Sequence, residues 1–111
     1  EFARVRIWLV LSVSFVWAQL ELSLVGVLTD SMHLDGAYAV ALAGNYVYVA
    51  NYDSDSFSIV DVSDKASPVL VGVLMNKSGL SRATSVACDG NFVYMTSHGA
   101  FWVLDASDKR R

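Results

Sequence analysis

Apolar and polar residues alternate in short runs along most of the chain, and turn-forming residues separate the runs. The alternation in AYAVAL at 37–42 and in YVYVAN at 46–51 predicts two strands. Between them, Gly44 and Asn45 can supply the positive φ that a tight hairpin needs. FSIVDV at 57–62 and VLVGVL at 69–74 predict two further strands. Together the four runs predict one antiparallel sheet.

The same pattern recurs 46 residues later. LVGVL stands at 24–28 and again at 70–74, and GNYVY at 44–48 returns as GNFVY at 90–94. The second copy is then two residues shorter in a loop, after which FWVLDASDK matches the earlier FSIVDVSDK. Four short strands recurring at this period are typical of β-propeller blades. We therefore expect an all-β fold of about two four-stranded antiparallel sheets, the second incomplete, from a larger propeller.

The first 19 residues do not follow the repeat closely. Arg4 and Arg6 precede an apolar run at 7–18, which ends with Val16 and Ala18 placed like the small residues before a cleavage point. The run is shorter than the about 20 residues that span a bilayer, so no stable membrane span is predicted. It resembles a secretory signal peptide. The alternative is a remnant strand of a preceding blade, because LSVSF at 11–15 alternates as a strand does.

The expected organisation has three parts: residues 1–19 as the signal-peptide-like segment or remnant strand, 20–74 as the first propeller repeat, and 75–111 as the second, incomplete repeat. LVGVL at 24–28 is expected to be an outer strand placed before the first full blade. Two blades cannot close a ring, and an open pair exposes large apolar faces. Self-association or neighbouring blades of a parent protein are therefore the expected partners, with the first LVGVL strand of one copy completing the last blade of the next.

Two stretches of the first repeat carry a family resemblance. GNYVYVAN at 44–51, followed by FSIVDVSDKASPVLVGVL at 57–74, resembles the LVIVD-repeat propellers of bacteria and archaea over about two units. The second unit departs from that pattern, with WVLDAS in place of IVDVS. VYVANYDSDSFSIVD at 47–61 is also similar to YVTN-type surface propellers. The resemblance implies a secreted or cell-surface protein whose propeller is a scaffold or binding surface, and it transfers no catalytic residue.

The charge distribution argues against nucleic acid as a partner, and the cysteine content argues against a disulfide. The formal net charge is −3, and most basic residues lie near the two ends of the chain, so the basic stripe that nucleic-acid binding requires is not visible. The single cysteine, Cys88, cannot form an intramolecular disulfide. Its place in an apolar alternating stretch predicts a buried, inert thiol.

Four acidic residues stand out near turns. Asp53 and Asp55 in NYDSDS have oxygen ligands of the kind that bind Ca²⁺, but we favour a solvated loop rich in turn-forming residues, and we predict no metal or cofactor. Asp61 and Asp105 occupy equivalent positions in the two repeats. Because a site that recurs in each blade is more readily structural than catalytic, we interpret both as turn residues.

Two aromatic residues are candidates for ligand or partner contact. Tyr52 and Trp102 are placed close to loops or outer faces, where an aromatic ring combines apolar area with a polar atom. Ser97 and His98 are adjacent on a predicted strand and would point to opposite faces, so they do not predict a nucleophile and its base. We expect a non-enzymatic binding or scaffold segment. The alternative is part of a lactonase-like or other propeller hydrolase, with Asp89 as its polar side chain near the central channel.

Overall fold

The computed structural model describes residues 4–11, 16–75 and 81–108, and side chains from residue 21 onward. These residues form nine β-strands. The all-β prediction is therefore confirmed. The described residues include no helix long and apolar enough to cross a membrane.

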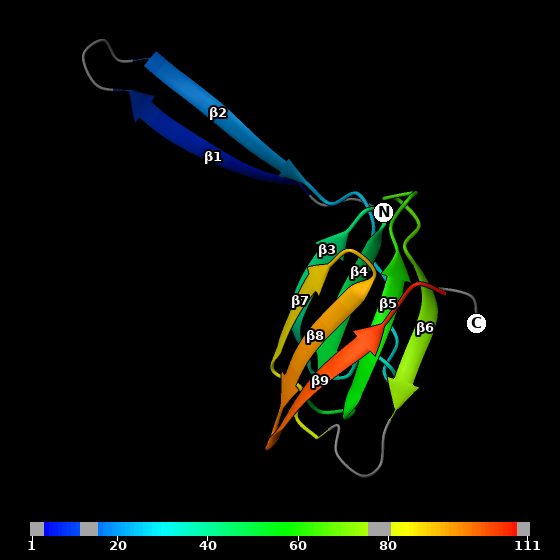
Figure 1. Cartoon of the computed structure of the whole chain (residues 1–111). Coiled ribbons are helices and arrows are strands. Elements are labelled where there is room, and N and C mark those ends of the chain that lie inside the picture. The colour runs from blue at the N-terminus through cyan, green and yellow to red at the C-terminus, as the bar shows by residue number, and fades with distance from the viewer. Residues whose placement is uncertain (1–3, 12–15, 76–80, 109–111) are drawn as a thin grey trace.

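The first repeat forms a four-stranded antiparallel sheet in the order β3-β4-β5-β6 (Figure 1). Its strands are β3 (Ala37–Ala43), β4 (Tyr46–Asn51), β5 (Ser56–Asp61) and β6 (Val69–Met75). Ala43 pairs with Tyr46, which leaves Gly44 and Asn45 as a two-residue turn. Gly44 has φ of 61°, a value that costs glycine little because it has no Cβ. All four strands agree with the sequence prediction to within one residue at each end.

The second repeat forms a three-stranded antiparallel sheet in the order β7-β8-β9. Its strands are β7 (Ser85–Asp89), β8 (Phe92–Ser97) and β9 (Ala100–Asp105). Gly90 and Asn91 form the first turn, and Gly90 has φ of 60°, as its equivalent Gly44 does. In the described part of the chain no strand pairs with the outer edge of β9. The prediction of a second, incomplete sheet is confirmed.

An antiparallel hairpin precedes the repeats. β1 (Arg4–Leu11) pairs with β2 (Val16–Ser23), from Arg4↔Ser23 to Leu11↔Val16, and the hairpin projects away from both sheets (Figure 1). The sequence interpretation of 11–15 as a remnant strand falls on residues that, apart from Leu11, lie outside the described part. The signal-peptide interpretation of residues 1–19 stays a prediction.

The first LVGVL segment, residues 24–28, is not a strand. This corrects the prediction that it forms an outer strand. The identical sequence at 70–74 lies in β6, where β5 supplies a partner. A strand needs a neighbour for its backbone hydrogen bonds, and no described strand lies beside residues 24–28 in a ladder. The same five residues therefore adopt two conformations in one chain.

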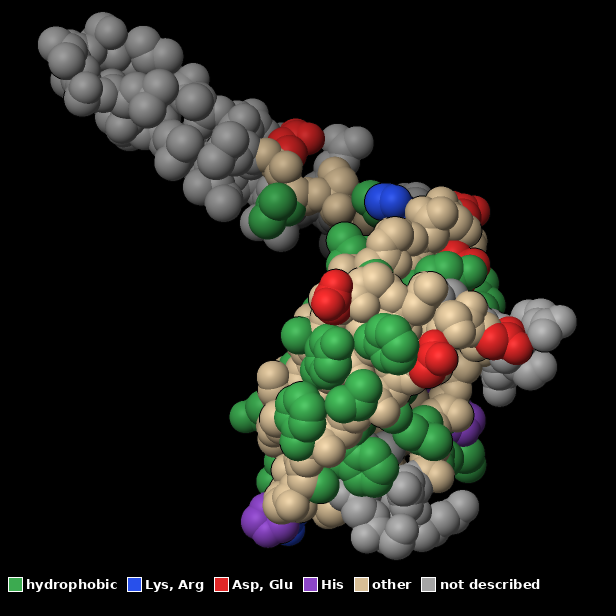
Figure 2. All heavy atoms as spheres, viewed as in Figure 1, with side chains coloured by type: hydrophobic (Ala, Val, Ile, Leu, Met, Phe, Trp, Pro, Cys, Tyr) green, Lys and Arg blue, Asp and Glu red, His purple; other side chains and the backbone are tan. Residues whose placement is uncertain are grey.

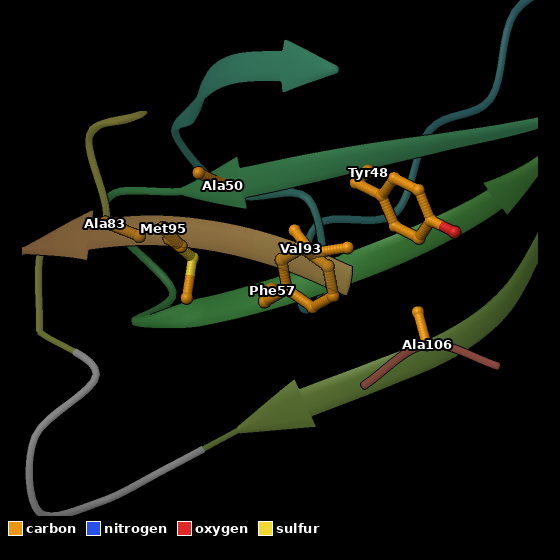
Figure 3. Close-up of a cluster of buried hydrophobic side chains, with 7 residues drawn as sticks. All are labelled: Tyr48, Ala50, Phe57, Ala83, Val93, Met95 and Ala106. Atoms are coloured by element: carbon orange, nitrogen blue, oxygen red, sulfur yellow. The ribbon is translucent and has the colours of Figure 1, made fainter. Parts of the chain in front are cut away.

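The two sheets pack face to face, with their first strands β3 and β7 as neighbours. Figure 3 shows the buried side chains between them. The four-stranded sheet contributes its contact face, centred on Tyr48 and Phe57, which are 1% and 3% exposed. The three-stranded sheet contributes its inner face, centred on Val93 and Met95, which are 0% and 1% exposed. Tyr46 and Ile59 also pack against this cluster, so bulky side chains fill the space between the two sheets.

Candidate functional site

The turns that follow β4 and β8 lie close to the residues that precede β7. His98 N–H donates to the Ser81 carbonyl at 2.8 Å, and Tyr52 N–H donates to the Gly36 carbonyl at 2.7 Å, so each turn is bonded to the segment before the first strand of its own sheet. An open depression of about 350 Å³ lies between these segments. Its lining residues are Tyr52, Arg82, Thr84, Ser97, His98 and Gly99. We call this depression the loop-end site.

Arg82 connects the two repeats at the loop-end site. Its guanidinium Cζ lies 5.9 Å from the centroid of the Tyr52 ring, within the range of a cation–π interaction. Its backbone N–H donates to Asp55 Oδ1 at 2.9 Å. Arg82 has φ of 55° and Asp55 has φ of 50°, conformations that non-glycine residues adopt at a cost. Their hydrogen bond links two unusual backbone positions at one edge of the depression.

Tyr52, predicted as a contact residue, is half-buried at the loop-end site. Its ring lies 5.5 Å from that of Tyr38 at an interplanar angle of 33°. Tyr38 contacts one side of the Tyr52 ring and the Arg82 guanidinium lies over it. The Tyr52 ring therefore forms an aromatic wall of the depression.

Trp102, the second predicted contact residue, is half-buried and packs against the cluster between the sheets. Its Nε1–H donates to Ser97 Oγ at 2.8 Å. Ser97 lines the loop-end site, so Trp102 supports that site from the interior. The Ser97 hydroxyl accepts the Trp102 Nε1–H, whereas His98 lies exposed in the turn after β8 and not on a strand as predicted. Both residues line the loop-end site.

Asp53 and Asp55, the weak metal candidates, both lie against other parts of the folded chain. Asp55 accepts the Arg82 N–H, and a Cβ added at Gly36 would overlap the Asp53 carboxylate. Among the described residues no group of three or more His, Cys, Asp or Glu side chains is arranged to hold a metal ion. The Ca²⁺ alternative for this loop stays a hypothesis.

A buried polar cluster on the other face of the four-stranded sheet was not foreseen from the sequence. Asn51, Ser56 and Ser58 are each 0% exposed. Asn51 Nδ2 donates to the His33 carbonyl at 2.9 Å and to Ser58 Oγ at 2.9 Å, and Ser58 Oγ donates to the same carbonyl at 2.7 Å. These bonds hold the His33 carbonyl against this rear face. The signal available was an asparagine and two serines at alternating strand positions that periodicity places on one face.

His33 is itself held by Asp30. The carboxylate accepts the backbone N–H groups of Met32 and His33 at 3.0 and 2.9 Å, and its Oδ2 lies 3.0 Å from His33 Nδ1. The hydrogen bond to the His33 ring, with those backbone N–H groups, lowers the pKa of Asp30. The segment that carries the His33 carbonyl is thereby ordered by its own turn.

Asp61 and Asp105 make the same turn in each repeat. Asp61 Oδ1 accepts the Ser63 N–H at 2.8 Å, and Asp105 Oδ1 accepts the Ser107 N–H at 2.9 Å. The bond from the Ser63 backbone lowers the pKa of Asp61. The structural interpretation of both aspartates is confirmed. Cys88 is half-buried, and burial raises the pKa of its thiol, which disfavours the reactive thiolate.

A comparison with protein-family models finds the LVIVD repeat at residues 36–76 and 81–110. The first match covers the four-stranded sheet and the second covers the three-stranded sheet. No curated protein matches the chain, and no solved structure matches it. The similarity to YVTN-type repeats stays a prediction.

Proposed function

The chain belongs to the LVIVD-repeat family, and from this premise we propose that it is a non-enzymatic binding segment of a secreted or cell-surface β-propeller. The loop-end site is its binding surface, and the occupant is a protein segment or small ligand that carries a carboxylate. The single observation that supports this proposal is the position of the Arg82 guanidinium over the Tyr52 ring in the lining of an open depression.

The chemistry of that pair favours a carboxylate. A guanidinium presents paired N–H donors that match two carboxylate oxygens, while an aromatic ring offers a flat apolar surface for the adjoining part of the ligand. Thr84 and His98, which line the same depression, add polar groups to it. Loops on a rigid sheet scaffold are a common place for such sites.

The test is an NMR titration of the chain with sodium benzoate, which carries a ring and a carboxylate, and with neutral benzamide as the matched probe. Benzoate is expected to shift the amide signals of Tyr52, Thr84 and His98 saturably, and benzamide is expected to shift them less. Arg82→Gly keeps the backbone N–H that Asp55 accepts, because glycine tolerates the φ of 55° found there. This variant should lose the benzoate response, whereas Lys65→Ala, a change at an exposed cation elsewhere, should retain it. Equal shifts in the wild type and Arg82→Gly would contradict the site.

Export from the cytoplasm has a separate test. Residues 1–19 fused to a phosphatase that is active only outside the bacterial cytoplasm are expected to give activity, because Arg4, Arg6 and the apolar run fit a signal peptide. Replacing both arginines by glutamate should reduce export. A fusion that stays inactive in the cell would argue for the remnant-strand interpretation.

A further inference from the structure

The exposed face of the three-stranded sheet repeats the buried face of the four-stranded sheet. Phe92, Tyr94, Phe101 and Val103 form this open face, and they are the repeat equivalents of Tyr46, Tyr48, Phe57 and Ile59 on the contact face. Phe92, Phe101 and Val103 are 47%, 67% and 57% exposed. Figure 2 shows the hydrophobic side chains gathered over β8 and β9. The contact face is covered by the next sheet of the chain, and the open face has the same chemistry.

The four-stranded sheet carries the complementary surface on its rear face. Val40 and Leu42 are 65% and 67% exposed there. Their equivalents in the three-stranded sheet, Val86 and Cys88, pack against the core between the sheets. Within the chain, therefore, the surface that carries Val86 and Cys88 already covers the contact face of the four-stranded sheet. In a second copy, the equivalent surface at Val40 and Leu42 is exposed and could cover the open face of the first copy in the same way.

Residues 24–28 lie beside the turn that follows β5. LVGVL in β6 pairs with β5, and Gly72, Val73 and Leu74 share a cavity of about 320 Å³ with Asp105, Ala106 and Asp108 at the end of β9. The first LVGVL segment lies against Lys65 and Ala66, since a Cβ at Gly26 would overlap the Lys65 carbonyl oxygen. Lys65 and Ala66 come shortly after β5, as Asp108 comes shortly after β9. Residues 24–28 therefore lie near the end of β5 in the four-stranded sheet, and β6 lies near the end of β9 in the three-stranded sheet.

We propose that two copies of this chain associate head to tail: the open face of one packs on Val40 and Leu42 of the other, and residues 24–28 of the second copy pair with the outer edge of β9. The exchanged strand completes a fourth strand in the three-stranded sheet by β-augmentation. Val27, which is 67% exposed, would lie opposite Trp102, as Val73 lies opposite Ser58. The contact is heterologous, so it repeats until a ring closes or a filament grows.

Two exposed substitutions separate this arrangement from others. Phe101→Asp disables the open face and Val40→Lys disables the rear face, and each leaves the other surface intact. Sedimentation velocity on the wild-type chain is expected to show association that increases with concentration, and each variant alone should weaken it by roughly 30-fold or more, the effect of losing an interface hot spot. An equimolar mixture of the two variants should form a dimer and nothing larger, because only one productive contact remains. Met32→Lys, at a residue that is 64% exposed outside both surfaces, should associate as the wild type does.

Several outcomes would overturn the proposal. A wild-type chain that stays monomeric up to millimolar concentration, with a cooperative thermal transition, shows that the faces do not bind one another. A mixture of the variants that remains monomeric shows that the contact is not head to tail. Val27→Pro removes a backbone N–H and fixes φ in residues 24–28, so undiminished association of this variant would contradict the strand exchange. Circular dichroism of each variant confirms that folding is retained.

Discussion

The rings of Tyr48 and Phe57 stack with centroids 5.8 Å apart and planes 8° apart, and the pair is buried between the sheets. Their repeat equivalents, Tyr94 and Phe101, stack at 6.3 Å and 13°, yet Phe101 is 67% exposed. Stacking geometry is therefore a property of the repeat, whereas burial depends on what covers each sheet.

This difference predicts unequal costs for the same substitution. Phe57→Ala should lower the free energy of unfolding by about 3–5 kcal/mol, because it opens a cavity in the core. Phe101→Ala should change it by no more than about 0.5 kcal/mol, the usual range for exposed positions. Urea denaturation monitored by circular dichroism, in dilute solution where association is minimal, measures both. Equal losses would contradict the burial difference on which this prediction depends.

Removal of the Asn51 amide should destabilise the chain by about 1–3 kcal/mol, since the His33 carbonyl and the Ser58 hydroxyl lose a buried partner. Asn51→Ala measured by thermal unfolding tests this. Asn45→Ala, at an exposed turn position whose carbonyl accepts the Val62 N–H through the backbone alone, is the matched control. If Asn51→Ala unfolded at the wild-type temperature and Asn45→Ala at a lower one, the conclusion that the Asn51 amide stabilises the chain would be wrong.

Loss of the Ser97 hydroxyl should destabilise the second sheet, because the Trp102 Nε1–H is left without its acceptor at 2.8 Å. Ser97→Ala is expected to cost about 1–2 kcal/mol. Ser107→Ala, at an exposed position after β9, should be neutral. Indole N–H exchange of Trp102 followed by NMR gives a local readout: faster exchange in Ser97→Ala is expected, and an unchanged rate would contradict the contribution of this bond.

Acid should weaken the turn after β5. The pKa of Asp61 is lower in the folded chain than its ordinary value of 3.8, because the carboxylate accepts the Ser63 N–H. Its contribution to stability is therefore present above pH 3.8 and is lost as pH falls through the lowered pKa. Asp61→Asn should be less stable than the wild type near pH 6, and the difference should narrow toward pH 2. Asp89→Asn, at the exposed end of β7, is the control. If the stability difference between the wild type and Asp61→Asn grew as the pH fell, the predicted direction of the pH dependence would be wrong.

Local features of the fold were accessible from the sequence. The turn at Gly44 and Asn45 joins strands adjacent in sequence, so residue spacing and glycine placement were sufficient to predict it. The role of Asp61 followed in the same way, since its hydrogen bond reaches only two residues ahead. Repetition then extended both predictions to the second sheet.

Features that depend on distant partners were not accessible. Arg82 was not singled out, because its neighbours Tyr52 and Asp55 lie in the other repeat, with Asp55 27 residues away. The Asn51 cluster is closed by His33, 18 residues away in sequence. Residues 24–28 were predicted as a strand from sequence identity with 70–74, yet pairing depends on a neighbouring strand that local sequence does not provide.

Strand order in both sheets is the same as order along the chain. Each strand therefore pairs with the strand that precedes it in the sequence, and the connecting loops are short. Short loops keep the entropy cost of loop closure low, and local pairing favours fast folding. The stretch that the family model matches at 36–76 is also one sheet with no crossing connection. Duplication of this stretch adds a whole sheet without rethreading any other part of the chain, so chains of this kind can lengthen during evolution one sheet at a time.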